Sequence, residues 1–205
     1  MRRAGIVAII LLTALVTAVA TSAFWILVYS SAPQPATEPA LTETAEPGTA
    51  PELVIGPGGL AIPVEGIGFA DLQDTYTDSR GGGSRVHNAI DIMAPHGTPV
   101  VAAAPGTVER LFFSRGGGGI TIYVRSDDRR WIYYYAHLQE YAPGLEEGQR
   151  VEQGQMIGRV GSTGNASPEG PHLHFAVHRM DPDDDWHGGT PVNPYPLLAG
   201  GGGGG

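Results

Sequence analysis

Gly170-Pro-His-Leu-His-Phe-Ala-Val-His178 is the stretch of this 205-residue chain that decides its fold class. It opens on glycine and proline and then runs through apolar and aromatic residues, a composition typical of a β-strand. Side chains two apart on a strand point to the same face, so His172 and His174 share one face. Two neighbouring imidazoles form half of a transition-metal site, and the stretch therefore bears on function as well as on fold.

Other stretches of the chain have the same strand-like character: they are short, rich in β-branched or aromatic residues, and separated by glycine turns. They are residues 99–102, 107–113, 120–124, 131–137 and 156–160. No stretch after residue 53 has a sustained helical period. We predict an all-β fold, with a hairpin that joins residues 107–113 to 120–124 through the glycines at 116–119.

The N-terminus predicts a membrane anchor. Arg2 and Arg3 precede an almost purely apolar run over residues 4–29, long enough to cross a hydrocarbon core of about 30 Å as a helix. A cleavable signal peptide is the alternative, but its apolar region usually spans only about 7–15 residues. We predict an uncleaved signal anchor over residues 1–30. The basic residues before it place the N-terminus in the cytoplasm and the rest of the chain in the periplasm or outside the cell.

The remainder of the chain divides by composition. Residues 31–52 are rich in Pro, Ala, Thr and Glu and predict a flexible tether. Residues 53–198 hold the strand-like stretches and predict the folded domain, and residues 199–205 predict a disordered glycine tail.

The net charge is −9 and lysine is missing. The acidic balance argues against nucleic-acid binding, and the missing lysine excludes Schiff-base chemistry.

The chain has no cysteine, so a zinc site must use nitrogen and oxygen ligands. His87 and Asp91 are four residues apart, a spacing that permits joint ligation on a strand or a helix. Alone, this pair is more often a surface pair, and His137 alone is more often a half-buried structural histidine. Together with His172 and His174 they exceed what one catalytic zinc needs, since three protein ligands suffice. Two imidazoles would remain for proton transfer or oxyanion stabilisation.

Residues 85–177 resemble the lysostaphin-type (LytM-like) zinc metallopeptidases, which cut peptide bonds in peptidoglycan. The matching stretches are Val86-His-Asn-Ala-Ile-Asp-Ile92, Ala94-Pro-His-Gly-Thr-Pro-Val100, Tyr135-Ala-His-Leu138, residues 151–165 and Pro171-His-Leu-His-Phe175. They cover most of the predicted domain in family order. The resemblance implies an antiparallel β-sheet domain of the sandwich/barrel-hybrid (duplicated hybrid motif) type.

Carried over residue by residue, the resemblance implies that His87, Asp91 and His174 bind Zn²⁺. It makes His137 and His172 catalytic, without saying which of the two is the general base. His96, His178 and His187 lie outside this set and are expected to be structural or surface residues. One position departs from the family: Ala89 stands where glycine is usual, and a positive φ there would strain an alanine.

The expected function is a membrane-tethered zinc endopeptidase that hydrolyses peptide bonds in peptidoglycan stems or cross-links. The alternative is a catalytically silent module of the same family that binds the wall or activates another wall hydrolase. A secreted metal- or carbohydrate-binding β-module is a third possibility, but it gives no reason for the two extra imidazoles. The expected partners are peptidoglycan and the membrane; a regulatory protein partner is not identified by the sequence.

Overall fold

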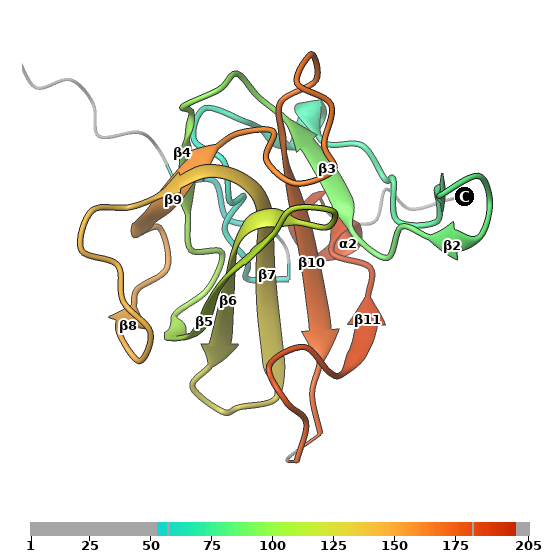
Figure 1. Ribbon diagram of the computed structural model, residues 1–205. Coiled ribbons are helices and arrows are strands. Elements are labelled where there is room, and N and C mark those ends of the chain that lie inside the picture. Colours follow the sequence, from blue (N-terminus) through green and yellow to red (C-terminus); the bar gives the residue numbers. More distant parts are fainter. Residues whose placement is uncertain (1–52, 57, 182, 200–205) are drawn as a thin grey trace, which may run out of the picture. The chain divides into compact units, whose positions relative to one another are not determined.

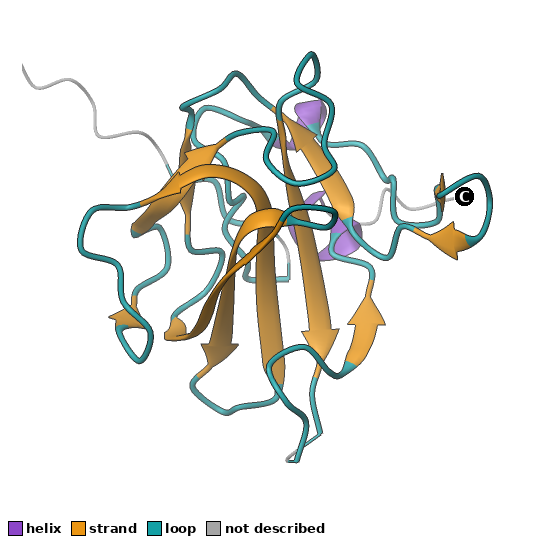
Figure 2. Ribbon diagram, in the orientation of Figure 1, coloured by secondary structure: helices purple, strands orange, loops and turns teal. Residues whose placement is uncertain are grey.

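Antiparallel β-strands make up most of the computed structural model (Figures 1 and 2), which describes residues 53–56, 58–181 and 183–199. The predicted anchor (1–30), the predicted tether (31–52) and residues 200–205 of the predicted tail lie outside the described residues. Within the described part, no helix has both the length and the apolar character needed to cross a membrane.

The described residues form eleven strands and two short helices. The strands are β1 (Ser79–Arg80), β2 (Arg85–Val86), β3 (Ile90–Met93), β4 (Pro99–Val101), β5 (Gly106–Ser114), β6 (Gly119–Ser126), β7 (Trp131–Tyr141), β8 (Arg150–Val151), β9 (Met156–Val160), β10 (His172–Arg179) and β11 (Thr190–Val192). The helices are the 3₁₀ turn η1 (Phe69–Asp71) and α2 (Tyr195–Ala199).

One nine-stranded sheet dominates the fold, with the order β11-β10-β7-β6-β5-β8 along its main path. β3 joins it at β10, and β9 joins it at β7 and carries β4. β1 and β2 form a separate two-stranded hairpin that leads into β3 (Figure 1). The prediction of an all-β, antiparallel domain is confirmed, and so is the hairpin between β5 and β6.

The core explains why the histidines of β10 lie on the outer face of the strand. Leu173, Phe175 and Val177 alternate with the histidines and are almost completely buried. The ring of Phe175 packs 5.3 Å from the ring of Tyr135 on β7, centroid to centroid. Burying such side chains contributes about 1.5–3 kcal/mol each, which fixes the register of the strand. With these side chains turned inward, His172 and His174 are held on the opposite face.

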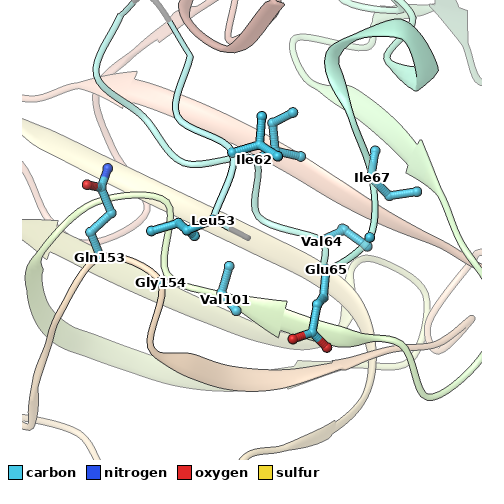
Figure 3. Close-up of a pocket in the computed structure, with 10 residues that line it drawn as sticks. Leu53, Ile62, Val64, Glu65, Ile67, Val101, Gln153 and Gly154 are labelled. Atoms are coloured by element: carbon cyan, nitrogen blue, oxygen red, sulfur yellow. The ribbon is translucent and has the colours of Figure 1, made fainter. Parts of the chain in front are cut away.

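A separate apolar cavity of about 210 Å³ lies under the first described residues (Figure 3). Leu53, Ile62, Val64 and Val101 form its apolar wall, and Glu65 contributes its one carboxylate. No histidine lines this cavity. The candidate histidines and Asp91 line a different cavity.

Candidate active site

Pairing of β3 with β10 brings the first candidate ligands together. Asp91 on β3 lies directly opposite His174 on β10 in the antiparallel register. His87 precedes β3, and its backbone N–H donates a hydrogen bond to the carbonyl oxygen of Asp78. β3 and β10 are far apart in the sequence but lie side by side in the sheet (Figure 1). Their pairing, with His87 just before β3, brings the three candidate ligands to one point.

The three donor atoms lie at distances that suit one metal ion. Asp91 Oδ1 is 3.0 Å from His87 Nε2 and 3.2 Å from His174 Nδ1. The two ring nitrogens are 2.9 Å apart. A tetrahedral zinc with bonds of 2.0–2.1 Å would separate its ligand atoms by about 3.3–3.4 Å. Two imidazoles and one carboxylate are also donors that zinc accepts, so the residues present fit a zinc ion.

Neighbouring groups fix the orientation of two of these donors. The carbonyl oxygen of Thr75 lies 2.9 Å from His87 Nδ1, and Arg80 Nη2 lies 3.1 Å from the same nitrogen. In the tautomer that binds a metal through Nε2, Nδ1 carries the proton and donates it to the Thr75 carbonyl. Thr75 Oγ1 accepts a hydrogen bond from the backbone N–H of Asp91 at 3.0 Å. Arg80 Nη2 donates to Asp91 Oδ2 at 2.5 Å. Because Arg80 occupies Oδ2, Asp91 presents Oδ1 to the two histidines.

His137 lies in the middle of β7, so the prediction that it ends a strand is wrong. The strand continues because residues 138–141 pair with β9. At His137 itself β7 has a β-bulge, where its pairing with β6 shifts between Ile120 and Ile122. His137 has a φ of 60°, a conformation that is uncommon outside glycine and that often marks functional sites. The bulge turns the imidazole toward the face that carries His174, whose ring centroid is 5.6 Å away.

Two glycine-containing loops hold His137 in this conformation. Its backbone N–H donates to the carbonyl oxygen of Gly118 at 2.7 Å. Its Nδ1 donates to the carbonyl oxygen of Thr163 at 2.8 Å, which leaves Nε2 free to accept a proton. The loops pack backbone to backbone: a Cβ on Gly164, whose φ is 77°, would lie 2.1 Å from the carbonyl oxygen of Gly117. Only glycine permits this approach.

His172 is the fifth candidate residue of the site. Its Nδ1 donates to the carbonyl oxygen of Gly170 at 2.8 Å, and its Nε2 lies 3.7 Å from Asp91 Oδ1. The His172 and His137 rings are 5.0 Å apart, centroid to centroid. Both residues therefore keep Nε2 available beside the triad of His87, Asp91 and His174.

These five side chains line a single cavity of about 490 Å³. The β1–β2 hairpin and the loop after Thr163 form its other walls; the residues are Arg80, Gly81, Arg85, Val86, Asn165, Ala166 and Ser167. Gly81 and residues 165–167 thus border the cavity, whereas Gly118 holds the backbone of His137. His96 is exposed, and His178 is hydrogen-bonded through Nδ1 to the carbonyl oxygen of Gly188.

Electrostatics favour the protonation states that metal binding requires. Burial raises the pKa of Asp91, but hydrogen bonds and charge from His174 and His87 lower it more, so that the pKa lies well below its usual range. Burial lowers the pKa of His174, against the opposing effect of Asp91. At neutral pH an ionised carboxylate thus faces a neutral imidazole, the forms in which both bind metal.

Burial also lowers the pKa of His137 to about 4, although its hydrogen bond to the carbonyl of Thr163 opposes the shift. An unfolded histidine titrates near 6.5, so between these values the unfolded chain binds more protons and stability is lost as the pH falls. For the chelator-treated, metal-free protein we expect His137 to lower the free energy of unfolding by about 2 kcal/mol between pH 7.5 and pH 5.

Denaturant titration at the two pH values measures this difference. His137→Gln should weaken the pH dependence, and His96→Gln, at an exposed histidine, should leave it unchanged. An undiminished dependence in His137→Gln would contradict the assignment.

Sequence reasoning missed the groups that orient the donors. Arg80 and the carbonyl oxygens of Thr75 and Thr163 carry no pattern that separates them from ordinary loop residues.

The structure shows no backbone strain of the kind expected at Ala89. Among the described residues, Asn88 rather than Ala89 has the positive φ, 58°, and Ala89 is fully buried. Asparagine tolerates this conformation, so alanine fits without strain.

The chain is similar to several curated proteins and solved structures. Among curated relatives, the L-Ala--D-Glu endopeptidase of Bacillus subtilis is 39% identical over 132 residues, which cover 62% of this chain and 39% of that protein. The peptidoglycan DD-endopeptidase ShyC of Vibrio cholerae is 40% identical over 91 residues, covering 44% of this chain and 20% of that protein. The chain thus spans less than half the length of these relatives.

Among solved structures, the catalytic domain of lysostaphin from Staphylococcus simulans is similar, with a TM-score of 0.53 and 31% identity over 62% of this chain and 90% of that chain. The model of Peptidase family M23 matches residues 85–194, a range that holds all five candidate site residues. The chain belongs to Peptidase family M23.

Proposed function

We propose that this protein is a zinc-dependent endopeptidase that hydrolyses peptide bonds in peptidoglycan stems or cross-links. The observation that carries the proposal is the convergence in one cavity of a metal-binding triad and two further imidazoles with free Nε2 atoms. The relatives named above as peptidoglycan endopeptidases support the substrate class.

In the reaction, His87, Asp91 and His174 would hold the zinc ion. The bound ion would act as a Lewis acid that polarises the scissile carbonyl and makes water more acidic. His137 would accept a proton from the attacking water, because its imidazole is neutral at pH 7 and its Nδ1 donates to the Thr163 carbonyl, which leaves Nε2 free. The water oxygen bonds to the carbonyl carbon, the C–N bond breaks, and the proton passes to the leaving amine. His172 lies beside His137, where it can stabilise the oxyanion or share the proton transfer.

The alternative is a silent module that binds the wall or activates another hydrolase. A module of that kind needs no intact set of metal donors and no histidines with free Nε2 atoms. Here all five side chains are present and hydrogen-bonded in orientations suited to chemistry. We therefore favour the enzyme.

The proposal includes a location. The apolar run after Arg2 and Arg3 would anchor residues 1–30 in the cell membrane with the N-terminus cytoplasmic. Residues 31–52 would tether the catalytic domain in the periplasm or outside the cell, where peptidoglycan lies. Protease protection of residues 53–205 in intact cells, followed by digestion once the outer barrier is opened, would test the periplasmic form of this topology.

The activity is tested on the full chain in detergent. We expect one equivalent of zinc per chain by elemental analysis, and release of peptide fragments from purified peptidoglycan by mass spectrometry. Chelation should stop the release, and added zinc should restore it. Zinc-loaded protein that releases nothing would favour the silent module. Release that survives complete zinc removal would overturn the proposed mechanism.

A further inference from the structure

The cavity beside the triad contains two arginines in different electrostatic situations. Arg80 donates to Asp91 at 2.5 Å and lies 3.9 Å from Asp78. Arg85 has no carboxylate within 4.0 Å among the residues that the structure describes, yet it lines the same cavity. Its charge is therefore uncompensated at the wall of the candidate active site.

The β1–β2 hairpin fixes this arrangement. Arg80 and Arg85 lie directly opposite each other in the antiparallel register. His87 directly follows β2, and the chain then runs into β3. Two like charges opposite each other destabilise a hairpin. Pairing with Asp91 offsets the charge of Arg80, whereas nothing in the described part of the chain offsets that of Arg85. An anionic ligand would supply the missing partner.

The other walls of the cavity do not compete for this arginine. Asp91 is the one acidic residue that lines it, and its two oxygens already face His87, His174 and Arg80. Asn165 and Ser167, on the opposite loop, are neutral. The protein as a whole carries a net charge of −9, but screening over a Debye length of about 8 Å makes nearby charges decisive. An anion that enters the cavity meets a locally cationic wall.

We infer that Arg85 binds a free carboxylate on a substrate residue that flanks the scissile amide. This inference rests on the proposed function and narrows its substrate class to peptide bonds next to an unamidated acidic residue. Peptidoglycan stems contain such residues: a glutamate joined through its side-chain carboxyl keeps its α-carboxylate free. The planar guanidinium matches a carboxylate with two parallel hydrogen bonds, which gives geometric selectivity as well as attraction. Glycine–glycine bonds offer no such group.

The test compares purified peptidoglycan with the same material after its carboxylates have been converted to carboxamides. For the wild-type protein we expect about tenfold faster hydrolysis of the untreated material, the size expected for one charge-assisted hydrogen bond. Arg85→Gln should bring this ratio close to 1, and Arg85→Lys, which keeps the charge, should retain part of it. Zinc content is measured on each variant, so that loss of the metal is not mistaken for loss of the preference.

Arg130→Gln is the matched control. Arg130 is also exposed and also lacks an acidic partner within 4.0 Å among the described residues, but it lies in the turn before β7 and does not line the cavity. This variant should keep the wild-type ratio. Equal hydrolysis of both materials by the wild type, or an unchanged preference in Arg85→Gln, would overturn the inference while leaving the proposed function intact. If untreated peptidoglycan is not hydrolysed at all, the proposed function itself fails.

Discussion

Replacing His174 with alanine is expected to remove bound zinc and to reduce peptidoglycan hydrolysis by about 10³-fold or more, because a Lewis acid contributes several kcal/mol to the transition state. His174 supplies one of three donors, and its Nδ1 lies 3.2 Å from Asp91 Oδ1 and 2.9 Å from His87 Nε2. Two remaining donors do not make up the three-ligand site that a catalytic zinc uses.

His178→Ala is the matched control for this variant. His178 lies four residues further along β10, and its Nδ1 is hydrogen-bonded to the carbonyl oxygen of Gly188 rather than to the triad. The His178→Ala variant should retain both bound zinc and hydrolytic activity. Elemental analysis, peptide release and thermal unfolding are measured on both proteins. A His174→Ala protein with full zinc content and full activity would remove this residue from the metal site.

His137→Asn is expected to separate metal binding from catalysis. Asparagine adopts a left-handed backbone conformation more readily than most residues, so the φ of 60° at this position should be kept. Loss of a positioned proton acceptor should lower the hydrolysis rate by about 10²–10⁴-fold. Zinc content should stay at the wild-type level, because the triad does not include His137.

Single-turnover hydrolysis and elemental analysis distinguish the possible roles of His137. Loss of zinc together with activity would make it a ligand, and an unchanged rate would make it structural. His96→Asn, at an exposed histidine, should change neither quantity.

Runs of β-branched and aromatic residues are sufficient to predict the long strands of the fold. β5, β6, β7, β9 and β10 each contain or match a predicted strand because side-chain burial and strand period agree there. The two-residue strands β1, β2 and β8 are too short to show any period. The bulge at His137 is also hidden, because it depends on the register with β6 and on the loop around Gly118.

The candidate site, like the fold, could be predicted from the sequence only in part. Histidine and aspartate have distinctive chemistry, so His87, Asp91, His137, His172 and His174 are all visible in the sequence. The groups that orient them are mostly backbone carbonyls, which every residue has, and their roles emerge only from three-dimensional contact. Arg80 and Arg85 are ordinary charged residues in a turn until the hairpin brings them to the cavity.

The pairing of β3 with β10 has a consequence for the order of folding. Asp91 and His174 are 83 residues apart in the chain, and contacts of such high sequence separation require the closure of a long loop. Asp91 leaves the ribosome well before His174 does, so a nascent or partly exported chain holds at most two of the three donors. With the proposed function, the chain would therefore be unable to hydrolyse peptidoglycan while it is being made, and would gain that ability only when the last long strand is in place.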